Sequence, residues 1–429
     1  MNPSGAGLPG SKRILVFLSG FLAWMGAGMQ ISLFPLISRT ALLDLFSSIA
    51  DKDLKEKQVA MWFSWYVCAF LFGAALGGWV FGALGDRLGR KRALGWSVMV
   101  YSLGTGVLWW LSDPIWIAVA RFIACLGVGG AWPNAVALVS EALPNVSKPW
   151  LAGWLGAAAN FGFVLLGLIA WKFPVTPDSW RWILLVAASP ALLGVFILAL
   201  APESPAWLAC RGEKGKGSGQ QVSVWRQPLL TCTLLGIALG AVPTVGTAVS
   251  ASWLIPWADQ AAEKKGLSEK KAPDPSVKAW TQVTRSTGAI AGSLLGGWIA
   301  SLIGRRLTYF LISLISLAIS ESIFLFLEPS HPWFGTFVFL MGLAGVTYFG
   351  WLPLYLPELF PTAARALGIG VSFNFGRIAA GFFALGSMAL VAWFGGNYAR
   401  IGQVTSLVFA LGMLIILFAP DTSKTRELT

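Results

Sequence analysis

Four ionisable side chains interrupt long apolar stretches of this 429-residue chain, and their chemistry stands out first. Arg121, Arg285, Glu321 and Arg377 each lie inside a run of otherwise uncharged residues. An ionisable group at membrane depth indicates a binding site or an ion pathway, because an unpaired charge in hydrocarbon is costly. The chemistry these groups offer is recognition of an opposite charge and movement of protons.

Arg377 is the candidate for contact with a solute. It lies 11 residues into its apolar run, which is roughly the bilayer centre at about 1.5 Å per residue. We expect it to bind a substrate carboxylate or sugar oxygens; the alternative is a structural arginine bonded to the backbone of neighbouring helices. Further polar side chains deep in apolar runs offer hydrogen bonds either to a polar solute or to another helix: Gln30, Asn134, Asn160, Tyr348 and Asn374.

Arg285 and Glu321 lie at similar depths in consecutive apolar runs. This match predicts a structural ion pair between two neighbouring helices. The alternative is that Glu321, the only acid inside a run, carries a coupling proton.

The elements that position these residues are membrane-spanning helices. Hydrophobic residues make up 56% of the chain and charged residues 12%, against about 25% charged in soluble proteins. A helix needs about 20 apolar residues to cross a bilayer. The sequence predicts an all-α membrane protein with twelve spans, at residues 14–37, 61–84, 93–111, 115–140, 150–171, 182–201, 228–254, 279–303, 307–327, 333–356, 366–393 and 401–419.

Charge predicts the orientation of these helices. Arg87, Arg90, Lys91 and Arg92 crowd into one short loop, and such clusters stay on the cytoplasmic side. Because twelve is even, both termini lie on that side, and we expect a multi-pass protein of the plasma (inner) membrane. The net charge of +12 then reflects loops facing anionic lipid headgroups rather than nucleic acid.

The chain is duplicated. Gly-Arg-Lys at 89–91 recurs as Gly-Arg-Arg 215 residues later, and the pattern E-x-x-P-x-x-x-[K/R] that starts at Glu141 recurs at Glu358. We therefore predict two parallel six-helix halves, 1–208 and 228–429, joined by a flexible cytoplasmic linker at 209–227. Parallel halves are an architecture of alternating access, with the substrate site between them.

Charged residues of both signs gather at the cytoplasmic ends of the runs. We expect them to form ion pairs when the cytoplasmic side closes and to separate when it opens, each pair contributing roughly 0–1 kcal/mol if partly solvated. The alternative is that they only anchor the topology. The acids are Asp86, Glu141, Glu203 and Glu358, and the bases are Arg87, Arg90, Lys148 and Arg365.

Several motifs resemble the major facilitator superfamily, in particular its sugar-porter and metabolite:proton symporter branches. They are GALGDRLGRKR at 82–92, RFIACLGVGG at 121–130, WRW at 180–182, PESPAWL at 202–208 and PELFPTAARALG at 357–368. The resemblance covers the whole chain. It implies the major facilitator fold and a rocker-switch transporter of small organic solutes. It also implies that Asp86 meets the start of the eleventh helix and that Arg121 acts in coupling. The alternative for Arg121 is a snorkelling side chain.

Three departures from the family pattern matter. Ser301 stands where the first half has Asp86. The stretch from Trp24 to Gln30 in the first span holds no acid, whereas symporters of the metabolite branch often carry one in that helix, and Cys125 replaces a glycine common in the fourth-span motif. The second departure weakens the expectation of proton coupling.

The predicted function is a secondary active or facilitative transporter of a sugar, sugar acid or organic acid. A sensor that binds without transport is the alternative, and a membrane-embedded enzyme is a weaker one, because the chain has one histidine and no paired intramembrane acids. We expect no catalytic or metal site and no cofactor. The expected partners are a solute, the bilayer and a proton as candidate coupling ion, with the protein acting as a monomer. Trp24, Trp132 and Trp351 are expected to pack in the core, with stacking on a sugar ring the alternative.

Overall fold

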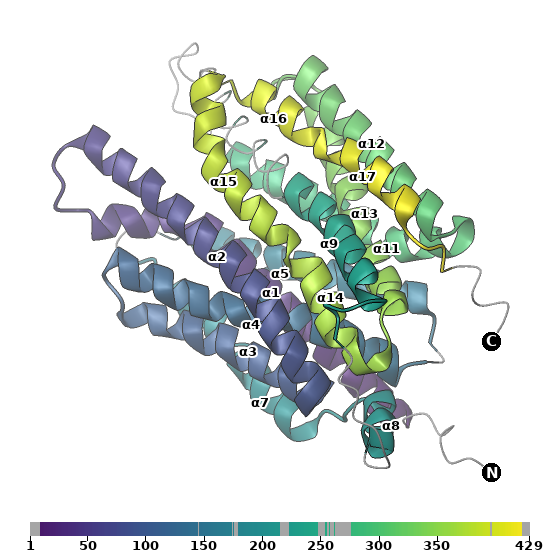
Figure 1. The fold of residues 1–429 in the computed structure, drawn as a ribbon. Helices are drawn as coiled ribbons and strands as arrows, with labels where there is room; N and C mark the ends of the chain where they lie inside the picture. Colours follow the sequence, from purple (N-terminus) through teal and green to yellow (C-terminus); the bar gives the residue numbers. More distant parts are fainter. Residues whose placement is uncertain are drawn as a thin grey trace.

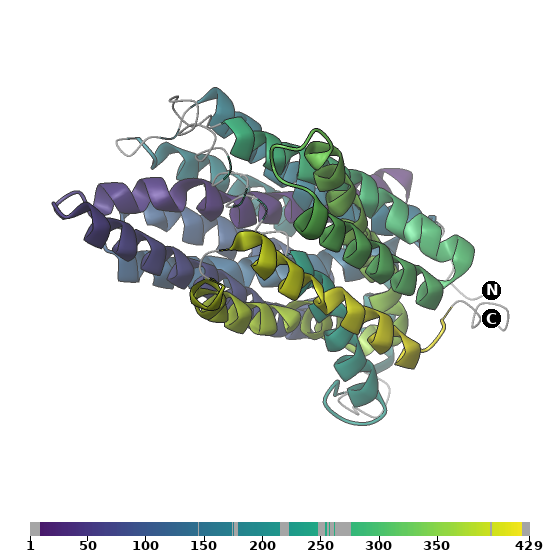
Figure 2. The ribbon, with the colours of Figure 1, turned by 90° about the horizontal axis from the view of Figure 1, so that it is seen from above.

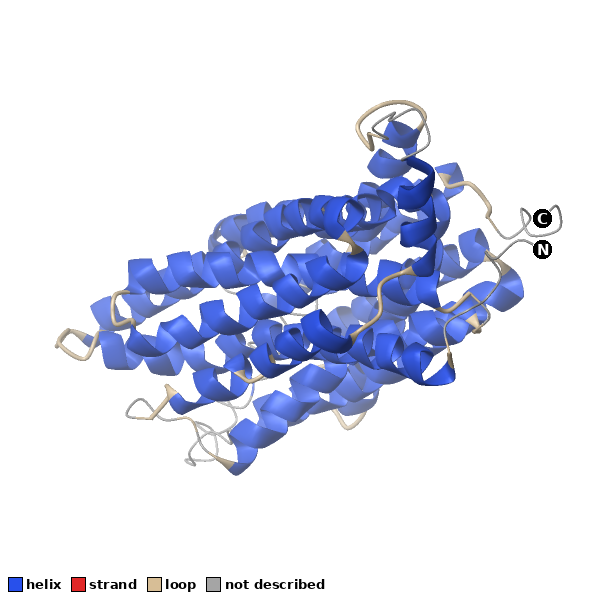
Figure 3. Ribbon diagram, turned by 90° about the horizontal axis from the view of Figure 1, so that it is seen from below, coloured by secondary structure: helices blue, strands red, loops and turns tan. Residues whose placement is uncertain are grey.

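The computed structural model is a bundle of helices that run roughly along one direction (Figure 2). It describes residues 9–144, 146–173, 175, 179–214, 223–247, 254, 257, 261, 276–394 and 397–422. No strand occurs among these residues (Figure 3). The predicted outer loop at 255–278 and the middle of the predicted linker fall largely outside them.

The first group of helices packs together on one side of the bundle (Figure 1). It contains α1 (Gly10–Leu45), α2 (Lys52–Leu88), α3 (Arg90–Val107), α4 (Pro114–Ala142), α5 (Lys148–Lys172), α6 (Trp182–Ala188), α7 (Ala191–Leu200) and the short α8 (Pro205–Lys214). Because α8 extends to Lys214, the predicted linker begins within a helix.

The second group contains the green and yellow helices of Figure 1. These are α9 (Leu229–Val245), α11 (Ser276–Ile303), α12 (Arg305–Phe326), α13 (Phe334–Leu359), α14 (Arg365–Asn374), α15 (Gly376–Trp393), α16 (Tyr398–Ser406) and α17 (Val408–Ile415).

Nine helices among the described residues are long and apolar enough to cross a membrane, and α9 is a shorter apolar helix. The other two predicted spans correspond to α3, which begins with three basic residues, and to α14 with α15. Large apolar side chains such as Trp96, Leu192 and Phe326 are 55%, 78% and 79% exposed. Such a surface suits lipid rather than water.

Three predicted spans are broken where the sequence pattern is continuous. The sixth is divided into α6 and α7 around Ser189, the eleventh into α14 and α15 at Phe375, and the twelfth into α16 and α17 at Leu407. Figure 1 shows α15 continuing from α14 along the seam between the two groups.

Glycines bring the two groups into close contact along two seams. In one seam α2 packs on α14, and a Cβ at Gly370 would lie 2.2 Å from the carbonyl oxygen of Gly78. In the other, α5 packs on α11 and α13, and a Cβ at Gly156 would lie 2.1 Å from the carbonyl oxygen of Phe349. Only residues without a side chain fit at these positions.

The internal repeat has a structural counterpart. Gly89 and Gly304 precede α3 and α12 with φ of 111° and 88°, values that favour glycine. The next residues, Arg90 and Arg305, donate hydrogen bonds back to the carbonyl oxygens of Gly85 and Ala300. Each half therefore buries one arginine at the same point of its repeat.

Candidate functional site

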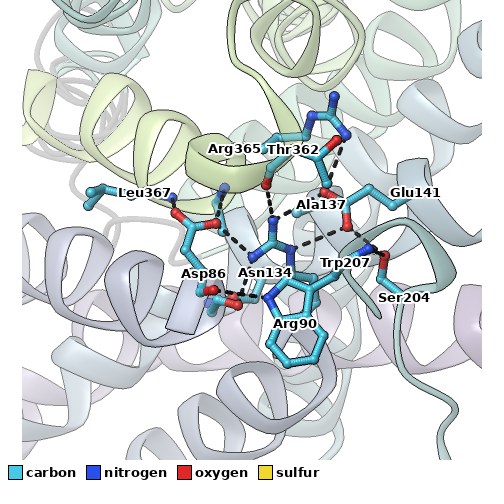
Figure 4. A network of polar contacts seen from close by, with 12 residues as sticks. Asp86, Arg90, Asn134, Ala137, Glu141, Ser204, Trp207, Thr362, Arg365 and Leu367 are labelled. Carbon is cyan, nitrogen blue, oxygen red and sulfur yellow. Dashed lines mark hydrogen bonds and ion pairs between the residues drawn. The ribbon is translucent and has the colours of Figure 1, made fainter. Parts of the chain in front are cut away.

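Arg90 is the centre of a polar network at one end of the bundle (Figure 4). Its guanidinium is fully buried and lies 2.6 Å from Oδ1 of Asp86 and 3.3 Å from Oε2 of Glu141. Nη2 also donates to the carbonyl oxygen of Thr362, which belongs to the second half. Removing one partner of a buried ion pair strongly destabilises a protein, because the other charge stays buried without compensation. We therefore expect the loss of this pair to cost more stability than the loss of the partly solvated pair expected from the sequence.

Asp86 links the two halves directly. Its carboxylate accepts hydrogen bonds from the backbone N–H groups of Ala366 at 3.2 Å and Leu367 at 2.9 Å, in the first turn of α14 (Figure 4). The positive end of the helix dipole favours an anion there. Arg365 adds a second link, because its Nη1 lies 3.2 Å from Oε1 of Glu141. The network thus holds the two halves together at this end of the molecule.

The second half repeats the buried pair but not the link. Nη2 of Arg305 lies 3.0 Å from Oε1 of Glu358, and Thr422 donates to the other oxygen of that carboxylate. Ser301, at the position of Asp86, donates to the carbonyl oxygen of Trp298 in its own helix. The contact between the halves is therefore asymmetric, since among the described residues only the first half supplies an acid that caps a helix of the other.

The remaining predicted gate residues lie around this network in different roles. Glu203 accepts from the backbone N–H groups of Lys91 and Ser204, which keeps it within the first half. Arg87 is exposed and forms no ion pair with a described residue. Lys148 lines a cavity of about 190 Å³ between α4, α5 and α13, beside Glu358 and Arg365.

Arg377 lies deep in the bundle, at the seam that α2 and α14 form between the halves. Its side chain is 5% exposed, and its Cζ atom lies 5.3 Å from the ring centre of Phe70 on α2 and 5.1 Å from that of Phe373. Its Nη1 atom has no hydrogen-bond partner among the described residues, and no ion pair between described residues includes Arg377. Burial of a cation without a counter-charge among the described residues is costly.

Arg121 approaches the same phenylalanine from α4. Its Cζ atom lies 3.8 Å from the ring centre of Phe34 and 5.6 Å from that of Phe70. Its polar contacts are to backbone carbonyl oxygens, from Nε to Tyr66 at 3.4 Å and from Nη1 to Gln30 at 3.5 Å. Both guanidinium carbons lie within 5.6 Å of the Phe70 ring centre, so they are at most about 11 Å apart.

A family model described as "Sugar (and other) transporter" matches residues 21–228 and 244–425. The chain belongs to this family. The structure resembles that of a major facilitator superfamily proton:xylose symporter, with a TM-score of 0.77 at 17% identity over 96% of this chain and 97% of that one. The fold is thus the major facilitator fold, with twelve transmembrane helices in two parallel six-helix halves.

Two relatives resemble this chain over most of its length. The sialic acid transporter of Escherichia coli is 26% identical, over 80% of this chain and 80% of that protein. The cis,cis-muconate transport protein of Acinetobacter baylyi is 27% identical, over 85% and 84%. The protein is therefore an integral, multi-pass membrane transporter of a small polar organic solute and not an enzyme. As in its superfamily, it works by rocker-switch alternating access between its two halves.

The predicted polar residues of the transporter lie in three environments. Gln30 is inside the first half, where it donates to the carbonyl oxygen of Ala187 and accepts from Thr105. Tyr348 is inside the second half and donates to Ser313 at 2.7 Å. Both side chains therefore form hydrogen bonds to other helices of their own half.

Asn374 and Asn134 lie nearer the seam. Nδ2 of Asn374 donates to the carbonyl oxygen of Gly129 in the other half at 3.2 Å, and Nδ2 of Asn134 donates to that of Phe81 at 3.0 Å. The Oδ1 atoms of both side chains are buried without a hydrogen-bond partner among the described residues. Asn160 is half-buried on α5.

The expected ion pair between Arg285 and Glu321 is not formed. Glu321 instead accepts a hydrogen bond of 2.5 Å from Ser406 on α16, and the ion pairs between described residues do not join it to Arg285. Helices α12 and α16 pack against each other, so the acid is turned toward its own half. Matching depth on consecutive helices was insufficient, because it leaves the facing direction open.

Several important residues were not predicted. Arg305 had a signal, since it is the repeat counterpart of Arg90, and Ser204 lies in the 202–208 motif and donates to Glu141 at 2.6 Å. Phe70 and Phe373 had none, because an apolar residue in an apolar helix is unremarkable until its neighbours are known. No cluster of metal-ligating side chains occurs in the described part of the chain.

Proposed function

We propose that the transporter carries a small organic anion whose carboxylate binds Arg377. The observation that carries the proposal is the buried guanidinium at the seam, which has an unpartnered Nη1 and aromatic faces around it. Bidentate pairing with a carboxylate would satisfy it. The named solutes of the two relatives, sialic acid and cis,cis-muconate, are both carboxylic acids.

Arg121 is proposed as a second cation of the same region rather than a snorkelling residue. It is 4% exposed and is held by Phe34 and two carbonyl oxygens inside the bundle. Its positive charge would favour entry of an anion toward Arg377. The polar groups of Asn134 and Asn374 would then offer hydrogen bonds to the body of the solute, and Asn160, on α5, is a further candidate.

The test compares ligand binding to wild type and Arg377→Gln by calorimetry on purified protein. The panel contains neutral sugars, sugar acids, dicarboxylates and aromatic acids. Loss of a charge-assisted bidentate contact of about 2–3 kcal/mol should weaken binding of the anion by roughly 30- to 150-fold. Arg181→Gln is the matched control, because that arginine pairs with Asp44 at a partly exposed position outside the seam.

Two outcomes would overturn the proposal. One is binding of neutral sugars alone, and the other is equal binding of anions by the wild type and Arg377→Gln. Either result would make Arg377 a structural residue and favour sugar transport.

We propose that the charged network at the ends of α2, α4 and α14 is the cytoplasmic gate, closed in this structure. The basic loop at 87–92 supports this orientation, which puts both termini in the cytoplasm and the protein in the plasma (inner) membrane. Residues 1–208 and 228–429 would be the moving halves. A monomer suffices, because both sides of the seam come from one chain.

Proton symport is the second candidate mechanism, and Glu321 is the observation that favours it, as the acid inside a predicted span. Uniport is favoured by Gln30 in the first span and by the contact between Glu321 and Ser406, which points away from the seam. Proteoliposomes with a pH-sensitive dye in the lumen separate the two. Acidification upon addition of substrate would establish symport, and substrate flux without acidification would establish uniport.

A further inference from the structure

An aromatic stack joins the two halves close to Arg377. The rings of Trp132, from α4, and Phe373, from α14, lie 4.0 Å apart at 17°. Trp24 meets both edge-on at 6.3 Å. Because the stacked rings belong to opposite halves, they must part when the halves rock, and two flat aromatic faces then become available at one place.

Two nitrogen donors beside this stack have no partner among the described residues. They are Nε1 of Trp132, whose residue is 1% exposed, and Nη1 of Arg377. A buried N–H without an acceptor is expensive, and the great majority in folded proteins have one. Two in one region therefore point to a ligand that supplies the acceptors.

The two donors are close enough for one small molecule. The Cζ atom of Arg377 lies 5.1 Å from the Phe373 ring centre, and the Trp132 ring centre lies 4.0 Å from it. The guanidinium and the indole are thus at most about 9 Å apart. This separation is within the span of a carboxylate, a directly attached six-membered ring and an acceptor on that ring.

We propose that the transported anion is a planar aromatic carboxylate with a hydrogen-bond acceptor on its ring. The proposal rests on the proposed function, because Arg377 holds the carboxylate in both. The ring replaces one member of the Trp132–Phe373 stack when the halves separate, and its acceptor takes the Trp132 N–H. Offset stacking and a satisfied donor then recover what the parted rings lose.

The first experiment measures binding of benzoate and cyclohexanecarboxylate by calorimetry on the purified full-length protein. The two share a carboxylate and a six-membered ring but differ in planarity and π electrons. Stacking contributes about 0.5–1.5 kcal/mol, so benzoate should bind about 2- to 12-fold more tightly. Phe373→Leu should remove most of this difference.

The second experiment isolates the indole N–H. Trp132→Phe keeps an aromatic ring and removes the donor. Pyridine-4-carboxylate has the shape of benzoate with an acceptor opposite the carboxylate, so the substitution should weaken its binding about fivefold more than that of benzoate, the effect of one hydrogen bond. Trp96→Phe, at a ring exposed to lipid, is the control and should change neither.

The outcomes separate the two proposals. If neither carboxylate binds while neutral sugars do, the anion proposal fails. If benzoate and cyclohexanecarboxylate bind equally, the anion proposal stands and the aromatic class is overturned. If Trp132→Phe weakens both aromatic acids equally, the ring acceptor is overturned.

Discussion

Replacing Asp86 by Asn should shift the transporter toward the state with its cytoplasmic side open. The Arg90 partner of Asp86 belongs to the same half, so that contact can persist in both states. Of the contacts that Asp86 makes, only the hydrogen bonds from Ala366 and Leu367 cross to the other half and break on opening. The closed state alone is therefore weakened.

The structure sets the size of this effect. Asn keeps one acceptor oxygen and replaces the other with an NH₂ group, so one charge-assisted bond is lost and the other becomes neutral. The attraction of the α14 dipole for the carboxylate, about 0.3–1 kcal/mol, is lost too. Together these changes amount to about 1–2 kcal/mol, or about 5- to 30-fold in the equilibrium between the two states.

Pulsed electron paramagnetic resonance measures that equilibrium. Spin labels at Leu88 and Leu302 report the separation of α2 and α11, from opposite halves, at their ends on the side of the proposed gate, and both positions are exposed. The background protein has its four free cysteines, at positions 68, 125, 210 and 232, replaced. We expect the long-distance population to grow in Asp86→Asn.

Arg87→Gln is the matched control. It removes a charge from the adjacent residue, which is exposed and outside the network. A distance distribution in Asp86→Asn identical to wild type would refute the assignment of these contacts to the gate. An equal shift in Arg87→Gln would attribute the effect to loop charge instead.

Two further predictions concern the seam and the second half. Gly156→Ala should abolish transport while leaving a folded protein, because a Cβ there would lie 2.1 Å from the carbonyl oxygen of Phe349 across the seam. Gly167→Ala on the same helix, where nothing lies within 4 Å of a Cβ, should transport normally in the same uptake assay. Ser406→Ala should lower thermal stability by about 0.5–1.5 kcal/mol, the contribution of its hydrogen bond to Glu321. If it instead shifts the pH profile of uptake with unchanged stability, Glu321 has a role in coupling.

The spans could be predicted because their requirement is local. About 20 apolar residues between charges suffice to find a helix. Their ends could not, since α1 continues to Leu45 and α2 begins at Lys52, beyond the apolar part of each pattern. A helix that leaves the hydrocarbon region keeps its backbone bonds while its composition becomes polar. The hydropathy pattern likewise does not reveal the boundary between α14 and α15 at Phe375, because the residues on both sides are apolar.

The gate could be predicted as a set of charges but not as a set of contacts. The duplication indicates Glu141 and Glu358 equally, yet Glu141 pairs across the seam with Arg365 while Glu358 pairs within its half with Arg305. A sequence repeat cannot distinguish the two, because symmetry in sequence leaves the contacts between the halves undetermined.

For Arg377, the sequence could predict the depth in the membrane but not the neighbouring side chains. The position of Arg377 along its helix follows from counting residues. Its contacts with Phe70 and Phe373 depend on how α2 and α14 pack, which is set by many weak contacts along both helices. The paired Trp132–Phe373 stack depends on the same packing.

The eleventh predicted span places two tasks at different points along its length. The first turn of α14 is tied to Asp86, whereas Arg377 is the second residue of α15. Substitutions that retune what α15 recognises therefore need not alter the seal that α14 makes. One scaffold can acquire new cargo specificity without becoming leaky, since selection can act at the two points independently.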